Sequence, residues 1–549
     1  MQFCFCYNYS EIELVRPNGS KKGNDMRKQM YAALTVSATM VCLSSSADAT
    51  RTMTGTTSGT DGVLSKAITW RAEDGGEEVH MAFGATYAES VDPAVYGFSP
   101  NATPDVNAKA LQKALDGGRK TVKVAKAGVY GLDRTVFIDS DTVLEFASGT
   151  VLRKMKPYSH VLVNRGAYNY GCDSNIVVRN VEISVNKMQS LPGPDSNAPG
   201  LRGHFAFYRV KNVECYNFTC NDCEDLQFCW HAVDFDGLLL DGFTIRGKKD
   251  GVHINRGRNF TIRNGVLRTD DDGIALNAGD WPGGCTPVMG SIENGVVENI
   301  VDEGGKYNFG RVITGCWKEW HPGMRLQRCD MLKVGMNVYT VYPMPLGTNE
   351  YISMTAPTHK HGVWKSPEGI KFLYLQDDGE TRADVKNVTF RNIRMARGIY
   401  CNWEIGGWAR LVHPEIPLKD YPVIDIKIEN VVRTASGSIV NGNASANIEF
   451  NNVNVKSDKG AILTMSRVRV GAGMGLYSTV RNIKVRNCTF DGNDRVDFAF
   501  NDPDGSGSIE LFGNNALRPV KIVGSLDNIA IKGDTPVDAP TSSKGRKGP

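Results

Sequence analysis

The chain has 549 residues, of which 22% are charged and 41% are hydrophobic, and its formal net charge is +3. This composition is ordinary for a folded protein and excludes wholesale disorder. The small net charge does not indicate binding to nucleic acid or to a membrane surface, so any partner has to be inferred from individual candidate binding sites. Glycine is unusually frequent, with 58 residues against a usual share of about 7%, which predicts many tight turns between short strands.

The N-terminal region carries the pattern of a secretory signal peptide. An apolar stretch over residues 31–43 follows Arg27 and Lys28 and precedes the small-residue site at 47–49. It is too short to span a bilayer, and this order of regions is typical of an export signal. We therefore predict an over-called start before Met26, cleavage near residue 49, and a secreted or periplasmic protein. At the other end, residues 533–549 are rich in Pro, Ser and Lys and predict a disordered tail.

Residues 104–117 predict an amphipathic helix that directly precedes the first strands. Beyond it, short segments that alternate apolar and polar residues recur, and an Asn or a Gly interrupts each one where the chain must turn. The clearest spacing, from Gly242 to Asn264, is 22 residues. The segments that show this alternation are 238–245, 260–267, 290–297, 385–393, 424–432, 446–455 and 480–490.

Strand-and-turn repeats of this length indicate a solenoid, because one coil cannot bury its apolar face alone. We predict an all-β fold, a right-handed parallel β-helix whose open first coil is covered by the helix at 104–117. The alternative is an antiparallel β-sandwich, which would require two-residue hairpin turns and would have no helix at its end.

The repeat disappears between residues 316 and 376, where Trp, Tyr and His gather. Because a long structureless loop is unusual, we predict a small inserted β-rich module there. The module divides the β-helix into parts at 50–315 and 377–532. Its aromatic residues either form its own core or stack on sugar rings, and the sequence leaves both open.

Ten of the 13 cysteines remain after cleavage at residue 49. Four of them, Cys215, Cys220, Cys223 and Cys229, form a cluster with one CxxC and no standard zinc spacing. Core packing or disulfides explain the cluster better than a metal site does, because Cys is also a small core residue.

The densest acidic cluster of the repeats is Asp270-Asp271-Asp272, and Asp250 precedes Asp272 by the repeat length of 22. Asp250 and Asp272 are thus predicted at equivalent positions of successive coils, about 4.8 Å apart, with Asp271 beside them. Crowding should raise at least one carboxyl pKa, which suits a proton donor next to groups that activate water. The alternative is a solvated Asp-rich turn.

The strands that follow these carboxylates align as 251–255 and 273–277. With Val252 and Ile254 buried, His253 is predicted to point outward onto the surface of the carboxylates, as a substrate contact. Asn255 and Asn277 align across the coils, and an Asn ladder is as good an explanation for them as a functional role.

Asp250-Gly, then Asp271-Asp272 and a strand ending in Asn277, resembles the core signature of polygalacturonases and related pectin-degrading glycoside hydrolases. The resemblance covers about 85–315 and 380–530. It implies a right-handed parallel β-helix and an inverting hydrolase without cofactor or metal. It also implies Asp271 as general acid, Asp250 and Asp272 holding the attacking water, and His253 and Asn277 on the substrate side.

Two elements of that family are missing. Its Gly-His-Gly is replaced by the stretch 305–311, and its Arg-x-Lys element, which grips a uronate, has no clear counterpart. Arg311 is the candidate replacement for substrate binding, and Arg394 and Arg397 are weaker ones.

The prediction is an exported, monomeric glycoside hydrolase that binds an acidic, pectin-like polysaccharide, with no nucleic-acid partner and no membrane span. One alternative is a polysaccharide lyase or uronate epimerase, in which the three Asp could bind Ca²⁺. The other is a glycan-binding β-helix without catalysis.

Overall fold

The computed structural model describes residues 66–71, 77–82, 87–342, 350–403, 422–442, 447–455, 461–465, 468–470, 474–476, 478–479, 482–490, 496–500, 503–504, 507–524 and 529–538. The predicted signal peptide lies outside the described residues, as do residues 539–549 of the predicted tail. Residues 533–538 of that tail are described: Gly533 ends the strand over Ile529–Gly533, and Val537 pairs with Val520.

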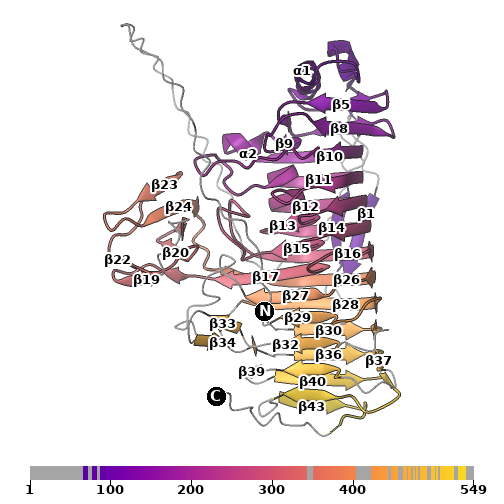
Figure 1. Cartoon of the computed structure of the whole chain (residues 1–549), viewed down its shortest axis with the longest axis vertical. Helices are drawn as coiled ribbons and strands as arrows, with labels where there is room; N and C mark the ends of the chain where they lie inside the picture. Colours follow the sequence, from indigo (N-terminus) through magenta and orange to yellow (C-terminus); the bar gives the residue numbers. More distant parts are fainter. Residues whose placement is uncertain are drawn as a thin grey trace. The chain divides into compact units, whose positions relative to one another are not determined.

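The described chain is a stack of parallel β coils (Figure 1). Strand β13 (Val252–Ile254) pairs in parallel with β15 (Ile274–Asn277), and Val252 faces Ile274. This is the 22-residue register that the repeats predict. The next coil is longer, since Ile274 faces Gly310. The fold is a right-handed parallel β-helix, which confirms the predicted fold class.

Among the described residues, 30 strands form the sheet of the coils, and all their pairings are parallel except that of β17 with β25. Its strands before residue 317 are β3 (Ser90–Val91), β4 (Lys120–Val124), β5 (Gly128–Leu132), β6 (Val136–Ile138), β7 (Thr142–Phe146), β8 (Thr150–Lys154), β9 (Leu162–Asn164), β10 (Asp173–Ser184), β11 (Gly203–Cys223), β12 (Phe228–Gly247), β13, β14 (Gly257–Thr269), β15, β16 (Ile292–Asp302) and β17 (Gly310–Cys316). Its later strands are β25 (Arg382–Ala383), β26 (Val385–Met395), β27 (Ile399–Trp403), β28 (Ile424–Arg433), β29 (Val440–Gly442), β30 (Asn447–Asn451), β31 (Asn454–Val455), β32 (Leu463–Met465), β36 (Asn482–Arg486), β37 (Thr489–Phe490), β38 (Phe498–Phe500), β40 (Gly507–Phe512), β41 (Asn515–Ala516), β42 (Ile522–Gly524) and β43 (Ile529–Gly533). Short pairs outside it are β1 (Lys66–Arg71) with β2 (Glu77–Ala82), β33 (Val468–Val470) with β34 (Met474–Leu476), and β35 (Ser478–Thr479) with β39 (Pro503–Asp504).

The long strands bend at Asn residues that adopt the left-handed conformation. Asn264, Asn299 and Asn392 have φ of 58°, 56° and 56°, which Asn tolerates better than most residues. Their amides stack from coil to coil, because Asn299 Nδ2 donates to Asn264 Oδ1 at 3.1 Å and Asn392 Nδ2 to Asn299 Oδ1 at 3.2 Å. The Asn ladder therefore runs along these bends, where the sequence predicts turns.

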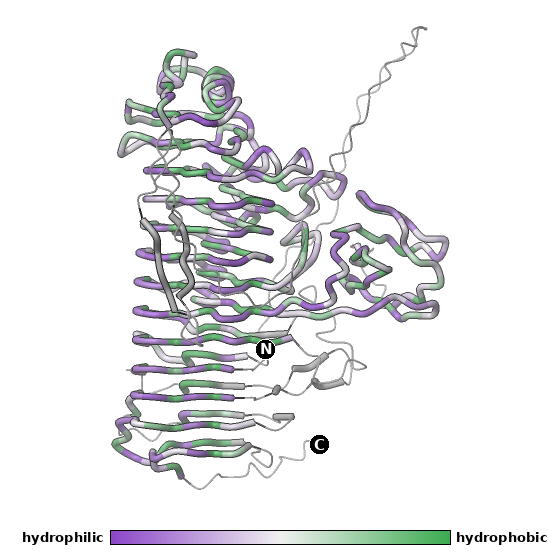
Figure 2. Tube along the Cα trace, turned by 180° about the vertical axis from the view of Figure 1, so that it is seen from behind, coloured by the Kyte–Doolittle hydropathy of each residue, from purple (hydrophilic) through white to green (hydrophobic). Residues whose placement is uncertain are grey.

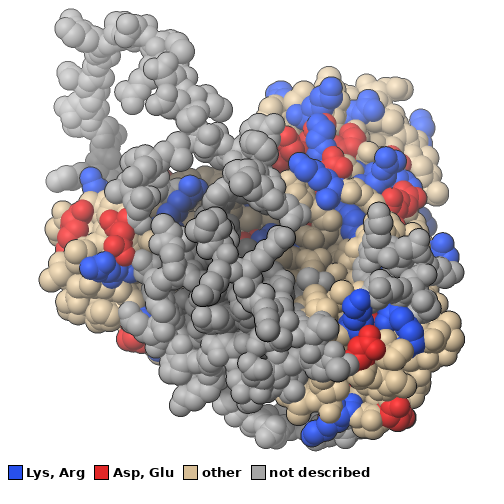
Figure 3. Space-filling view, turned by 60° about the horizontal axis from the view of Figure 1, so that its bottom comes forward, with Lys and Arg blue, Asp and Glu red and all other residues tan. Residues whose placement is uncertain are grey.

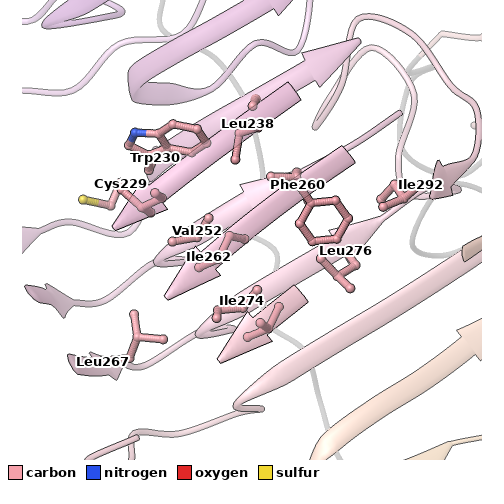
Figure 4. Packing of buried hydrophobic residues seen from close by; sticks show 14 of the residues in the cluster. Cys229, Trp230, Leu238, Val252, Phe260, Ile262, Leu267, Ile274, Leu276 and Ile292 are labelled. Carbon is pink, nitrogen blue, oxygen red and sulfur yellow. The ribbon is translucent and has the colours of Figure 1, made fainter. Parts of the chain in front are cut away.

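The interior is filled by apolar side chains that repeat in successive coils (Figure 4). Large rings sit over glycines of the next coil. Phe260 faces Gly295, and a Cβ on that glycine would lie 1.9 Å from the ring. Close packing of this kind allows only glycine beside the phenylalanine. The alternation of hydrophobic and polar residues along the strands is visible in Figure 2.

A helix covers the first coils. Helix α1 (Pro104–Leu115) is capped by Thr103, and it buries Ala108, Leu111 and Leu115 against the core. This matches the predicted helix at 104–117. Two further helical segments occur among the described residues, and both are short: η1 (Pro93–Tyr96) precedes α1, and α2 (Gly166–Asn169) precedes β10.

A separate sheet lies between β17 and β25, the stretch in which the repeat disappears. It contains β18 (Lys318–Glu319), β20 (Met331–Val334), β21 (Asn337–Val341), β24 (Lys371–Gln376) and β23 (Val363–Lys365), beside the pair β19 (Met324–Leu326) and β22 (Tyr351–Ser353). Tyr339 and Phe372 are fully buried in its own apolar cluster. Gln376 ties the sheet to the coils, since it accepts from the Met289 amide at 2.7 Å and donates to the Met289 carbonyl at 2.9 Å.

Nine of the ten described cysteines are buried. Cys215, Cys220, Cys223 and Cys229 belong to the main core cluster. Of the explanations that the sequence leaves open for this cluster, the structure agrees with core packing. On the surface, basic and acidic side chains of the described residues are interspersed (Figure 3).

Candidate active site

Three carboxylates meet where consecutive coils begin. Asp250 comes just before β13, and Asp271 and Asp272 come just before β15, so the parallel register brings them together. One oxygen from each lies within 4.8 Å of the others. The side chains of Asp250 and Asp272 are only 3% exposed, whereas that of Asp271 is 21% exposed. Asp270, by contrast, is exposed. The cluster is thus a built site and not a solvated turn.

Two cations touch the cluster. The Lys249 ammonium is hydrogen bonded to Asp271 Oδ2 and lies 3.7 Å from Asp250 Oδ1. Arg311, on β17, places Nη1 at 3.6 Å from Asp272 Oδ2. Arg311, which the sequence predicts as a substrate contact, therefore lies beside the carboxylates.

The three carboxyl groups of the cluster differ in pKa. Burial, and then the negative charge of Asp271, raise the pKa of Asp250 to about 7 and that of Asp272 to about 7. Burial acts on Asp271 in the same direction, but it is outweighed by the Lys249 ammonium and its hydrogen bond, by Arg311, and by a hydrogen bond with Asp250, so the pKa of Asp271 is lowered. At neutral pH the cluster holds an ionised Asp271 beside partly protonated neighbours.

This pattern differs from the role that the resemblance implies for Asp271. A general acid must carry a proton, and in the free protein the lowest carboxyl pKa of the three belongs to Asp271. The cause is the Lys249 ammonium, which has no role in the predicted site.

His253 points away from the apolar core, as predicted, but its side chain is only 1% exposed. Its Nδ1 lies 2.6 Å from Asp250 Oδ2, and its ring stacks on Phe228 at 3.8 Å between centroids. Burial lowers its pKa well below the ordinary value, so it is neutral. In the free protein His253 contacts Asp250, and the predicted contact with substrate would need this ring to become accessible.

Asn277 completes a chain of contacts behind the carboxylates. Its Nδ2 donates to Asp280 Oδ2 at 3.0 Å and lies 3.4 Å from His253 Nε2. His253 Nε2 is thus an acceptor, and its Nδ1 donates to Asp250. Asp280 in turn accepts from Arg311 Nη1 at 3.1 Å. The predicted ladder of Asn255 and Asn277 takes another form, since Asn255 Nδ2 donates to the Asn277 carbonyl at 2.5 Å.

The stretch that replaces Gly-His-Gly supplies Asn308, whose Nδ2 donates to Asp272 Oδ1 at 2.9 Å. Arg397 is buried and bound to Asp302, and it donates to the main-chain oxygens of Thr269 and Asp271. Arg397 therefore supports the carboxylate turn from the interior instead of serving as a substrate contact. Arg394 is exposed.

The six residues that the sequence predicts for the site lie together in the structure, and Lys249, Asp280 and Asn308, which it did not predict, lie among them. Lys249 precedes Asp271 by the same 22 residues that separate Asp250 from Asp272, so the register could have revealed it. Asp280 lies in the loop after β15, for which the repeat gives no position.

Among the described residues, the three carboxylates form a cluster whose oxygens are close enough together to bind a metal ion. Ca²⁺ usually takes six to eight oxygen ligands, and here Lys249 and Arg311 already neutralise part of the charge. We therefore assign no metal to the site.

The fold of the chain is similar to that of several proteins of known structure. The chain is similar to a Yersinia enterocolitica family 28 exopolygalacturonase, with 14% identity, coverage of 86% of this chain and 84% of that one, and a TM-score of 0.42. It is also similar to the A-module of an Azotobacter vinelandii mannuronan C-5 epimerase (12% identity, coverage 83% and 100%, TM-score 0.37). A third is a double mutant of the tailspike protein of E. coli bacteriophage HK620 (10% identity, coverage 85% and 70%, TM-score 0.43).

At the level of sequence, no protein family and no curated protein matches the chain. The class that the fold itself defines is the parallel β-helix. In the part of the chain that is described, the helices are too short and too polar to cross a membrane.

Proposed function

We propose that this protein is a glycoside hydrolase whose catalytic carboxylates are Asp250, Asp271 and Asp272. The observation that carries the proposal is the compact cluster itself, with oxygens within 4.8 Å and carboxyl pKa values driven apart by burial and by Lys249. Pairs of carboxyls with separated pKa values can donate a proton to the glycosidic oxygen and activate water in the same reaction.

The proposed substrate is an acidic polysaccharide. Lys249 and Arg311 have side chains that are 22% and 21% exposed beside the carboxylates, so an acidic sugar would meet two cations there. Arg311 would fill the place of the missing Arg-x-Lys element. A neutral glycan would gain nothing from these charges.

We further propose inversion at the anomeric carbon, with Asp250 and Asp272 holding the water, as the resemblance implies. Inverting enzymes usually separate their two carboxyls by about 6.5–9.5 Å. In this tighter cluster the water would have to be held by two carboxyls at once, and Asp250 and Asp272 are the buried pair that offers this.

The alternative lyase chemistry is less well supported. A lyase needs a strong base, and Lys249 is the basic residue closest to the carboxylates. Burial would favour its neutral form, but Asp250 and Asp271 outweigh burial and raise the pKa of Lys249 above its ordinary value. A lysine held as a cation is a poor base.

The test is a screen of the exported protein against defined acidic polysaccharides, with NMR of the anomer that is released. Hydrolysis with the inverted anomer and no unsaturated product supports the proposal. Unsaturated product would show a lyase, and activity that survives Asp271→Asn and Asp272→Asn would show that these carboxylates are not catalytic.

Export is part of the proposal and rests on the N-terminal sequence. We propose that the mature protein begins near Thr50. Peptide mapping of the exported form tests this, and recovery of intact residues 1–25 would contradict it.

A further inference from the structure

Asp271 and Lys249 form the outer layer of the site. Their side chains are 21% and 22% exposed, whereas those of Asp250 and Asp272 are 3% exposed. An anion that approaches the cluster therefore meets the Lys249 ammonium before it reaches the buried carboxylates. That ammonium is also what keeps Asp271 ionised in the free protein.

The other cation of the site is held differently. Arg311 Nη1 is bound at 3.1 Å to Asp280, whose side chain is 4% exposed. A guanidinium between Asp280 and Asp272 is fixed by buried partners on two sides. Lys249 is a single ammonium on a flexible stem. It lies between the outer Asp271, to which it is hydrogen bonded, and the buried Asp250 at 3.7 Å, so Lys249 is the cation that can change partners.

We propose that Lys249 is a specificity-determining residue that couples recognition of an acidic sugar to the protonation of Asp271. The ammonium transfers from Asp271 to an acidic group of the substrate, and a proton then passes from Asp250 to Asp271. This inference rests on the proposed function.

The proton transfer balances within the cluster. The O–H bond of the Asp250 carboxyl breaks and an O–H bond forms on Asp271, which leaves Asp250 as carboxylate and Asp271 as acid. One oxygen of each group lies within 4.8 Å of the other, and burial raises the pKa of Asp250 to about 7, so a proton on Asp250 is close to Asp271. His253 Nδ1 donates to the Asp250 carboxylate that results.

The coupling explains why Asp271 is ionised in the free protein and protonated when an acidic sugar is bound. In the free protein Lys249 holds Asp271 in the form that cannot donate a proton. With an acidic sugar bound, Asp271 becomes the acid and Asp250 the base, which is the division of roles that the resemblance implies. A neutral sugar leaves Lys249 on Asp271 and is cleaved slowly.

The charged and titratable groups around Asp271 come from several elements, and the test has to isolate Lys249 among them. They are Lys249 and Asp250 between β12 and β13, Asp272 beside it, Arg311 on β17, and Arg397, which donates to the Asp271 carbonyl. Around Asp250 they also include Arg202 and His253.

The first experiment is a carboxyl ¹³C NMR titration of the free protein, in wild type and in Lys249→Met. We expect the titration of Asp271 to move to higher pH in Lys249→Met. Lys248→Met is the matched control, because Lys248 pairs with Glu224 at 2.6 Å, is 57% exposed, and should leave Asp271 unchanged. Lys249→Arg keeps the charge and should keep the titration low, provided that its melting curve matches wild type.

The second experiment compares polygalacturonate with its methyl-esterified form. The ratio of kcat/KM values, acidic over neutral, should fall by at least about tenfold in Lys249→Met, the loss expected for one charge-assisted hydrogen bond. An unchanged ratio, or an unchanged titration of Asp271, overturns the inference while hydrolysis by wild type still supports the proposed function. Conversely, if the titration of Asp271 shifts in Lys249→Met but the wild-type protein cleaves neither polymer, the proposed hydrolysis of a pectin-like substrate is contradicted while the coupling of Lys249 to Asp271 stands.

Discussion

Asp250 Oδ2 lies 2.6 Å from His253 Nδ1, and both side chains are almost completely buried. Three residues apart in sequence, they face each other because β13 turns the histidine outward onto the side from which Asp250 projects. The neutral imidazole donates to Asp250 and accepts from Asn277, so this pair fixes the orientation of the Asp250 carboxyl beside Asp271. The predictions below follow from this buried network and from the packing beneath it.

Asp250→Asn, Asp271→Asn and Asp272→Asn should each lower kcat by at least about 10²-fold on an acidic polysaccharide, because each removes a group needed for proton transfer or water activation. KM should change little. Steady-state kinetics on purified variants measure this. Asp270→Asn is the matched control, since Asp270 is exposed and outside the cluster, and it should retain wild-type rates. An equally large loss of kcat in Asp270→Asn would indicate that these substitutions act by disrupting the turn.

The stability of the protein should depend on Asp272. Its pKa is raised in the folded state to about 7 from an ordinary 3.8, so the protonated form is favoured by folding. This contribution is fully present below pH ~4 and is lost as the pH rises through about 7. Asp272→Asn cannot ionise, so its Tm relative to wild type should rise between pH 5 and pH 8. Parallel Tm curves of the two proteins would contradict the raised pKa.

Gly295→Ala should destabilise the coils by about 1–3 kcal/mol, the usual cost of overpacking a core. The added Cβ would lie 1.9 Å from the ring of Phe260, which is fully buried and has no room to move. Chemical denaturation measures the change. Gly193→Ala is the control, because nothing lies within 4 Å of its Cβ position, and it should change the free energy of unfolding by less than about 0.5 kcal/mol.

Replacing residues 317–381 by a short glycine linker should leave a folded β-helix with a lower Tm. The ends are already neighbours, since Cys316 pairs with Arg382 and Gly315 with Ala383. The loss of stability follows from Leu373 and Leu375, which pack in the main core, and from the bonds between Gln376 and Met289. Circular dichroism and thermal melting test this. Complete loss of the strand signal would mean that the removed sheet is required for the coils to fold.

Much of the fold was predictable because its signals are local and repeated. Alternation of apolar and polar residues marks the strands, and Asn and Gly mark the bends where φ is positive. The 22-residue spacing predicts Asp250 opposite Asp272, and the register of β13 with β15 has this same spacing. In a parallel stack, sequence spacing converts directly into spatial contact, since each coil repeats the path of the one before.

Only the tertiary structure decided how the site is charged and how deeply it is buried. The exposure of His253 depends on Phe228, which comes from the preceding coil, and that of Asp280 on the loop after β15. The state of Asp271 depends on Lys249, since a carboxyl pKa is set by the summed effects of burial and of charges a few ångströms away. The sequence determined which carboxylates stack, because register is a one-dimensional property. Which of them holds the proton is a three-dimensional property, and it required the packed site.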